Sequence, residues 1–542
     1  MYKRQLQDDV ALSEERRDLE IAHHLIAAGE ASDAQELVEY ATRAGTHALA
    51  RFAWSEAARF FDGAIGRLEK DGPSMKLASL HHQSGVAFFR VLDASPCLRH
   101  FARAVSLYAE LGDDMMRSRV SVDRARAVNW MGMMGTPEFD QSRLELEQCL
   151  DRTSVSHRLL RAEILSVLAE QTWATNDPVF AEALCLEALE ETRPEVDHLL
   201  RAEISVTLGL AQLSRLNQRA ALATWRFGAL HSRWANELSS TARCLQRMRM
   251  ALFVSGRIDE ARALTSEVSA LNRIVQLPSE AALTHAITAA IAVLAGDFEG
   301  AEKEMVRGID QLSRARYPWA LALMIPTRAC ARALAGDLDG AMSALEELAD
   351  SPIHAVNERD LETFTERHRS LVNYFVGDPV RLSPERRAEL IAELQNLEHD
   401  EAGLYQACLA LELASALQDA ELARLALPIA DEAVKRGWIV TTGWPFFLPR
   451  LVGAARLILG DVAGAVERLE AALPAASSDA FPIEWGRVRF DLARALVLSL
   501  EESVLPRAVI LAREAREALG RFPRNDFLER AEGLVRYLEE RF

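Results

Sequence analysis

The sequence lacks the short motifs that mark common catalytic sites. It contains no GxxxxGK[ST] phosphate loop, no GxGxxG after a strand-like run, and neither an HExxH nor a GxSxG motif. Its carboxylate pairs lie on polar helix faces, and none accompanies the positioned nucleophile that general acid–base chemistry needs. We therefore expect a protein that is not an enzyme and holds no cofactor.

Metal-binding patterns are also missing. The six cysteines are far apart, with no CxxC pair and no Cys–His cluster of zinc spacing, which favours small core residues in a reducing compartment. Two adjacent histidine pairs, His23–His24 and His81–His82, invite a metal interpretation. Neighbouring side chains on a helix point about 100° apart, so neither pair closes a site alone. We expect no metal.

Long apolar runs and an excess of basic residues are absent too. No run of about 20 apolar residues occurs, so no membrane span is expected, and the N-terminus lacks the apolar core of a signal peptide. The 80 acidic side chains outnumber the 62 basic ones, for a net charge of −18, which argues against nucleic-acid binding. These absences favour a cytoplasmic protein that binds neither nucleic acid nor membrane.

What the sequence does contain is dominated by helix formers. Leu, Ala, Glu and Arg prevail, whereas strand-type runs of Val, Ile, Thr and Tyr are scarce. The 27 glycines and 18 prolines are too few for a disordered or fibrous chain. At 542 residues, the chain is long enough for several domains or one extended array. An all-α protein is the first expectation.

A short phrase is repeated along the chain, as "LAGDFEGA" at 294–301, "LAGDLDGA" at 334–341 and "ILGDVAGA" at 458–465. Internal repeats of this period indicate a solenoid or a related array. With its glycine as a marker, steps of 40 to 42 residues extend over nearly the whole chain. The markers are Asp93, Gly135, Asn176, Leu216, Gly256, Gly296, Gly336, Gly377, Gln418, Gly460 and a position near Glu501.

Each marker stands between two amphipathic stretches, so the predicted unit is helix, tight turn, helix. Glycine reaches the left-handed conformation that ends a helix at low cost, and the following aspartate can cap the next helix. An alanine five residues after the marker would let the two helices of the hairpin approach closely. These alanines are Ala181, Ala221, Ala261, Ala301, Ala341 and Ala465.

The second helix of several units carries alanine, a bulky residue four positions later and a small residue seven positions later. Examples are Ala57–Phe61–Ala64, Ala181–Cys185–Ala188, Ala221–Trp225–Gly228, Ala301–Met305–Gly308 and Ala465–Leu469–Ala472. This pattern resembles the tetratricopeptide repeat, which implies an α-solenoid: a right-handed superhelix of helical hairpins. The period here is 40 to 42 residues instead of about 34, which implies longer helices or loops.

The beginning of the chain follows a different spacing. Residues 1–14 fit no later pattern and are interpreted as an artefactual or disordered start, residues 15–70 as three successive long helices, and residues 71–542 as the repeat array. Around His23–His24, Gly29 and the "WSEAARFF" helix, the sequence resembles the segment that begins the repeat region of large bacterial signalling ATPases. These include MalT-like and LuxR-type activators and ATPases fused to class III nucleotide cyclases. The resemblance implies a region that senses or transmits a signal.

First helices of tandem hairpins line the concave, ligand-binding face of a solenoid. Arg328 and Arg369 stand eight residues before the markers Gly336 and Gly377, and Arg332 and Asn373 stand four residues before them. Adjacent repeats in register would bring these four side chains to one patch. Further candidates at related offsets are Arg249, His285 and Arg456. One interpretation is a basic stripe that reads carboxylates of a peptide or partner helix. The alternative is a set of salt bridges between neighbouring helices.

Two aromatic segments, Tyr317–Trp319 and Gly443–Phe447, are a second candidate, or else open helices and pack against the preceding unit. Together, these features predict a non-catalytic scaffold or sensor region of a bacterial signalling protein. Its partner would be a protein or peptide, or a domain of its own parent protein. The alternative is a ligand-sensing fragment that controls an ATPase, cyclase or transcription-activator domain.

Overall fold

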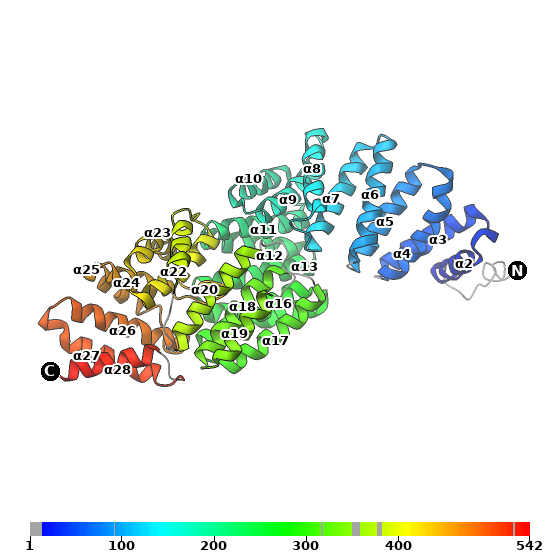
Figure 1. The fold of residues 1–542 in the computed structure, drawn as a ribbon. Coiled ribbons are helices and arrows are strands. Elements are labelled where there is room, and N and C mark those ends of the chain that lie inside the picture. Colours follow the sequence, from blue (N-terminus) through cyan, green and yellow to red (C-terminus); the bar gives the residue numbers. More distant parts are fainter. Residues whose placement is uncertain are drawn as a thin grey trace. The chain divides into compact units, whose positions relative to one another are not determined.

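The computed structural model describes residues 14–51, 53–91, 93–315, 318–349, 358–376, 382–523 and 526–541. Within these ranges the secondary structure is helical apart from an isolated antiparallel bridge between Val440 and Phe447, and successive helices form hairpins (Figure 1). The all-α, solenoid-type prediction is confirmed. Among the described helices, none is long and apolar enough to cross a membrane.

The chain forms two compact units. Unit 1 comprises Met1–Asn176 and Ala183–Arg193, and unit 2 comprises Asp177–Glu182 and Pro194–Phe542. The helices up to the boundary are α2 (Glu14–Ala28), α3 (Ala34–Ala50), α4 (Trp54–Leu68), α5 (Met75–Arg90), α6 (Ala94–Glu110), α7 (Asp114–Trp130), α8 (Pro137–Arg152), α9 (Arg158–Ala174) and α10 (Pro178–Glu191). Short 3-10 turns are η1 (Gly29–Ala31) and η2 (Glu69–Asp71). The three long helices predicted for residues 15–70 are α2, α3 and α4.

Unit 2 continues the hairpins to the C-terminus. Its helices are α11 (His198–Ser214), α12 (Gln218–Trp234), α13 (Leu238–Val254), α14 (Ile258–Ala263), α15 (Thr265–Val275), α16 (Pro278–Leu294), α17 (Phe298–Ala315), α18 (Pro318–Leu334), α19 (Leu338–Ala349), α20 (Glu358–Val376), α21 (Pro384–Leu394), α22 (Glu401–Leu417), α23 (Ala420–Arg436), α24 (Leu448–Ile458), α25 (Val462–Ala472), α26 (Pro482–Leu498), α27 (Leu505–Leu519) and α28 (Asp526–Glu539), with η3 (Glu502–Val504) before α27.

Most marker positions end helices in the left-handed conformation, as predicted. Positive φ angles occur after the helix ends at Asn176, Leu216, Gly256, Gly296, Gly336, Gln418 and Gly460. Gly135 also has a positive φ but lies in the turn before α8, and the left-handed residue after α7 is Gly132. The turn near Glu501 is centred one residue earlier, on Leu500. Asp93 instead precedes α6 with φ −91°, and Gly377 lies outside the described residues. The 40-residue period therefore locates turns even where the glycine is missing.

The predicted caps and close helix contacts are also present. Asp297 Oδ1 accepts from the Gly300 amide at 2.9 Å, and Asp337 and Asp461 make the same bond to the third residue after them. The alanines five residues after the markers are all fully buried. A small side chain at this position thus allows the two helices of a hairpin to pack closely.

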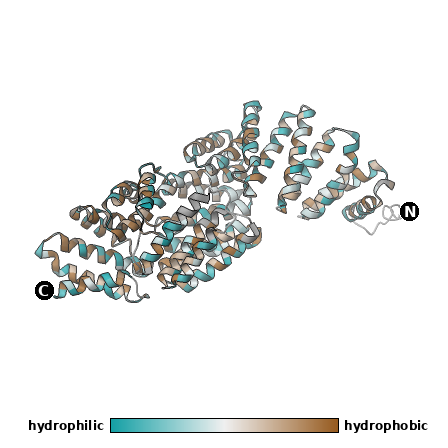
Figure 2. Ribbon diagram, viewed as in Figure 1, coloured by the Kyte–Doolittle hydropathy of each residue, from teal (hydrophilic) through white to brown (hydrophobic). Residues whose placement is uncertain are grey.

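The hydrophobic residues of the hairpins form the core. Ala57, Phe61 and Ala64 are completely buried, and so are the equivalent residues Ala301 and Met305 of a later hairpin. Hydrophobic and hydrophilic residues alternate along the helices, as amphipathic helices require (Figure 2). All six cysteines are unpaired and buried, in agreement with their predicted role as small core residues.

Within unit 2, helices that are far apart in sequence also meet. Contacts join α11 with α22, α16 with α26, and α20 with α28. Phe522, in the turn after α27, packs on Phe298 at the start of α17 with ring centroids 6.1 Å apart. Unit 2 therefore closes on itself, unlike an array in which each repeat contacts only its neighbours.

Candidate protein-binding surface

The interior of unit 2 is occupied by its own chain. Residues 437–447, between α23 and α24, are non-helical and almost entirely buried. Trp438 Nε1 donates to the Leu216 carbonyl oxygen at 3.2 Å. The amides of Ile439 and Val440 both donate to the carbonyl oxygen of Val254, at the end of α13, at 2.8 and 3.1 Å.

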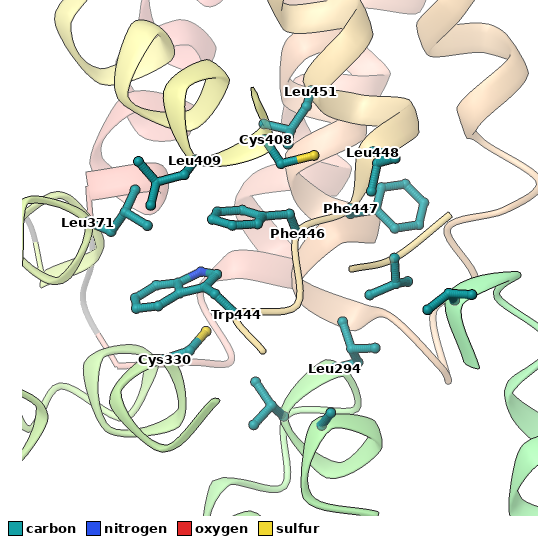
Figure 3. Close-up of a cluster of buried hydrophobic side chains, with 14 of the residues drawn as sticks. Leu294, Cys330, Leu371, Cys408, Leu409, Trp444, Phe446, Phe447, Leu448 and Leu451 are labelled. Atoms are coloured by element: carbon teal, nitrogen blue, oxygen red, sulfur yellow. The ribbon is translucent and has the colours of Figure 1, made fainter. Parts of the chain in front are cut away.

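The second half of this inner segment contacts later helices. Thr327 of α18 donates to the Gly443 carbonyl oxygen at 2.6 Å, and the Trp444 amide donates to the Tyr405 hydroxyl of α22 at 3.2 Å. In Figure 3 the Trp444 side chain lies between Phe446 and Cys330. The aromatic segment 443–447 therefore packs against several helical hairpins. This contact is wider than the predicted one, which was with the preceding hairpin alone. Of the other aromatic candidate, Tyr317 and the side chains of Pro318 and Trp319 lie outside the described residues.

The size of this burial shows that the inner segment is a permanent part of the core. Its large apolar residues Trp438, Val440, Trp444, Phe446 and Phe447 are all at most 2% exposed. At about 1.5–3 kcal/mol for each buried side chain, the segment contributes on the order of 10 kcal/mol. A ligand that displaced the inner segment would have to make up for this loss of burial. That would take most of the binding free energy of a nanomolar complex, which is about 12 kcal/mol. The inside of unit 2 is thus not an open groove.

A buried ionic cluster lies beside the inner segment. Arg450 and Arg487 both donate to Glu412 and to Glu484, with Arg450 Nε 2.8 Å and Arg487 Nη1 2.7 Å from Glu484 oxygens. Burial raises the pKa of Glu412, but the two guanidinium groups more than offset this and hold the pKa below its ordinary value. The adjoining cavity measures about 30 Å³, room for one or two water molecules.

The arginines predicted to form a stripe are brought together, but with glutamates between them. Arg328 Nη2 and Arg332 Nη2 of α18 lie 2.7 and 2.6 Å from the same Glu302 oxygen of α17. Burial raises the pKa of Glu302, and hydrogen bonds from both arginines lower it by more, so the net pKa is below normal. The residues of α18 that face the inner segment are instead Thr327 and Cys330.

Ion pairs to α19 and α20 extend this set. We call the set the arginine ladder, and it consists of Arg328, Arg332 and Arg369 with Glu302, Glu346 and Glu347. Arg328 also bonds Glu347 of α19 at 2.8 Å, and Arg369 of α20 lies 3.7 Å from the adjacent Glu346. Asn373, one turn further along α20, is partly exposed. The alternative interpretation, ion pairs between neighbouring helices, matches this geometry. A role of these arginines in binding a partner stays a prediction.

The three remaining candidates also have intramolecular partners. Arg249 is fully buried and donates to the Thr284 carbonyl oxygen at 2.8 Å, and burial lowers its pKa to about 10. His285 Nδ1 lies 2.7 Å from Glu304. Arg456 lies 2.7 Å from the aspartate that caps α25. None of these contacts joins Arg249, His285 or Arg456 to Arg328, Arg332 or Arg369.

A different surface, on α12, has the character of a protein-binding site. Phe227, Leu230 and Trp234 follow one another at helical spacing and are 36%, 44% and 57% exposed. They lie opposite the buried residues Ala221 and Trp225 that hold α12 in its hairpin. Further exposed apolar side chains are Val196 in the turn before α11, Leu199 in the first turn of α11 and Leu238 at the start of α13. Exposed apolar side chains gathered on one helix face, as on α12, mark interaction sites on soluble proteins.

The exposed indole is held in place by other rings. Trp234 packs on His198 and His231 with ring centroids 5.2 and 5.1 Å apart, and Phe227 packs on His231 at 4.2 Å. The Arg201 guanidinium lies 5.2 Å from the Phe227 ring centroid. The aromatic surface is therefore preorganised, which reduces the entropy lost when a partner binds.

The two histidines beneath this surface are within hydrogen-bonding distance of each other. His198 Nδ1 and His231 Nδ1 lie 3.0 Å apart, so one must donate and the other accept. Burial lowers the pKa of His231 to about 4, with smaller contributions from the nearby charges of Arg201 and His198. His231 is therefore neutral at physiological pH, and the aromatic surface rests on an uncharged His231 ring.

The adjacent histidines considered as metal ligands have separate partners. His81 contacts His100 and Glu69, whereas His82 contacts Asp123. His23 lies 3.4 Å from Glu56. In the part of the chain that the structure describes, no three His, Cys, Asp or Glu side chains are grouped so that they could hold a metal ion.

Comparison with known proteins adds fold similarity alone. No family model and no curated protein matches the chain. Among solved structures, a Rap protein complexed with competence and sporulation factor has 11% identity and a TM-score of 0.48 over 73% of this chain and 99% of that one. The apo quorum sensor NprR from B. thuringiensis has 12% and 0.43 over 57% and 92%. Yeast Tom70 has 13% and 0.30 over 94% and 97%. The fold assignment depends on the hairpins of this chain itself.

Proposed function

We propose that this chain is a non-catalytic scaffold that binds another protein through the outward face of α12. The observation that carries the proposal is Trp234, a 57% exposed indole held by packed rings and continued by exposed Phe227 and Leu230. Tryptophan is strongly enriched among residues that dominate binding energy in protein interfaces.

Within this proposal, the scaffold acts as a sensor or regulatory region of a bacterial signalling protein. The support is the resemblance of the segment around His23, Gly29 and the "WSEAARFF" helix to the start of the repeats in signalling ATPases. Under the same proposal, the partner is a domain of such an ATPase or cyclase. An in-frame phosphate loop encoded upstream would support this parent, and a stop codon directly upstream would contradict it.

The arginine ladder is proposed as a second contact. Arg369 is 44% exposed and its partner Glu346 is 63% exposed, so their 3.7 Å pair can exchange with a partner's carboxylate. Replacing Arg328 and Arg369 with Glu tests this contact. Reduced capture by a folded double variant is expected, and unchanged capture would remove the ladder as a site.

A ligand-binding role for unit 2 has weaker support. A crevice of about 320 Å³ lies between the turn at Gly256 and residues 474–481, within the size range of ligand pockets. Its carboxylate, Asp259, has a side chain that is 98% exposed, so it offers little desolvated charge to orient a ligand. The exposed aromatic face of α12 therefore favours protein binding.

Affinity capture from the source organism, followed by mass spectrometry, tests the proposal. We expect Leu230→Asp and Trp234→Asp to abolish recovery of the partner. Ile510→Asp is the matched control, because Ile510 is 56% exposed on α27 in the same unit. Equal partner recovery by all folded variants would overturn the proposal.

A further inference from the structure

The outward face of α12 is basic as well as aromatic. The sequence of α12, QRAALATWRFGALHSRW, contains three arginines and no acidic residue. Arg219, Arg226 and Arg233 are all exposed, in a protein whose net charge is −18. A local concentration of positive charge on an acidic protein selects negatively charged partners.

The arginines and the apolar residues lie along one stripe. Arg219, Arg226 and Arg233 recur every seven residues, which places them on one side of the helix, since two turns bring a position back to nearly the same direction. Phe227 and Trp234 follow the last two arginines directly. The stripe thus has an apolar row with a basic row beside it.

The basic row has labile partners. Arg233 Nη2 lies 2.8 Å from Glu267, and both side chains are about half exposed, at 55% and 47%. Hydrogen bonds from Arg257 lower the pKa of Glu260, and the positive charge of nearby Arg226 makes a smaller contribution in the same direction. Exposed pairs of this kind contribute little to stability, so the arginines can exchange to carboxylates on a partner at small cost.

We infer that the partner of α12 presents an acidic amphipathic helix. Its apolar side chains would pack on Phe227, Leu230 and Trp234, and its carboxylates would pair with Arg226 and Arg233. A helix suits this surface because its i, i+3 and i+7 positions match the spacing of the apolar row. This inference rests on the proposed function and adds the chemistry of the partner.

An anionic membrane also attracts a basic, aromatic helix, but the surroundings of α12 oppose it. Glu260 and Glu267 flank the arginines, and the net charge of −18 repels an anionic bilayer. A partner helix can avoid these two carboxylates, whereas a continuous lipid surface cannot. A folded protein partner is therefore the better fit.

A pair of designed peptides of the same length as α12 tests the inference. Both carry Leu at i, i+3, i+4 and i+7, with Glu at the flanking positions of one and Lys in the other. Binding to the full chain is measured by fluorescence anisotropy. With two arginine–glutamate pairs formed, we expect the Glu peptide to bind roughly tenfold more tightly than the Lys peptide.

Charge-reversal variants identify the surface. Arg226→Glu with Arg233→Glu should remove or invert the preference for the Glu peptide. The matched control is Arg507→Glu with Arg513→Glu, because these α27 arginines are also about half exposed, at 52% and 55%, and ion-paired. The control should bind as the unchanged protein does. Circular dichroism confirms that each variant is folded.

The outcomes separate the two proposals. If Trp234→Asp abolishes partner capture but both peptides bind equally, the protein-binding role stands and the acidic helix is wrong. If no α12 variant changes either assay, both are wrong. Cosedimentation with phosphatidylserine vesicles, or formation of a dimer that the Arg226→Glu and Arg233→Glu changes disrupt, would also overturn the inference.

Discussion

The left-handed turn at Gly296 lies directly beneath the ring of Phe522. A Cβ added to Gly296 would be 2.6 Å from Cε1 of Phe522, and the glycine has φ +78°. The residue therefore serves two purposes, since it ends α16 and leaves room for a ring from the turn after α27. The repeated phrase contributes to the closure of unit 2 as well as to its local turns.

Gly296→Ala should destabilise unit 2 more than Gly460→Ala. Both positions have φ near +79°, which costs about 1–2 kcal/mol for alanine. Only Gly296 adds a collision, for another 1–3 kcal/mol, because nothing lies within 4 Å of a Cβ at Gly460. Urea denaturation measures the difference. Adding Phe522→Ala to Gly296→Ala should reduce the difference in unfolding free energy between the Gly296 and Gly460 variants. Equal effects of the two glycine changes would contradict this explanation of the closure.

Trp444→Ala should lower the free energy of unfolding by about 3–5 kcal/mol, because it opens a large cavity at the centre of unit 2. Trp444 is 1% exposed. The matched change is Trp234→Ala, at a 57% exposed tryptophan, for which about 0.5 kcal/mol is expected. Thermal unfolding followed by circular dichroism compares them. Similar losses would mean that the inner segment is not a core element.

Removing one member of the buried ionic cluster should be costly. Arg450→Met leaves Glu412 and Glu484 without one of their two guanidinium partners, at a cost of about 3–5 kcal/mol. Combining it with Glu412→Gln should recover part of the loss. Arg513→Met, at an exposed pair with Glu539, should cost about 1 kcal/mol or less. Additive losses in the double variant would argue against a coupled cluster.

The histidine pair beneath Trp234 gives a pH prediction. The pKa of His231 is about 4 when folded, against 6.5 as its ordinary value. The unfolded chain thus binds a proton at a pH where the folded chain does not. This histidine's stabilisation is complete above pH 6.5 and is lost as the pH falls towards 4, by about 3 kcal/mol at most.

Nuclear magnetic resonance tests the cause directly. The His231 ring signals should show no titration between pH 7 and 5, and His231→Leu should make stability less dependent on pH over this range. A midpoint near 6.5 for His231 would contradict the burial of a neutral His231 ring.

Much of the local architecture was predictable because it depends on short-range chemistry. The spacing of Gly256, Gly296 and Gly336 located left-handed turns. The aspartates after Gly296 and Gly336 cap the next helix, and the alanine five residues after each glycine is buried, as expected. The inner segment was not predictable in this way. Its bonds from Trp438 to Leu216 and from Ile439 to Val254 join residues roughly 200 positions apart, and no periodicity encodes such contacts.

The apolar surface of α12 was not among the predicted candidates for a related reason, and a binding role of the predicted arginines stays a prediction. The first helices of the hairpins were expected to line an open concave face. In the structure, the face of α18 towards the interior meets the inner segment through Thr327. The signal for the α12 surface was nevertheless present, since Phe227, Leu230 and Trp234 form a second apolar stripe on the side of the helix opposite the packing positions Ala221 and Trp225.

The most direct test of the account is photo-crosslinking from position 234. A benzoylphenylalanine at 234 on the full-length chain, expressed in the source organism, would react with any side chain that covers this face. The account predicts a discrete crosslinked partner that is absent when the probe stands at position 510 and is lost on Leu230→Asp. A folded protein that gives no crosslink at 234, or the same products from both positions, would contradict the claim that α12 is a protein-binding surface.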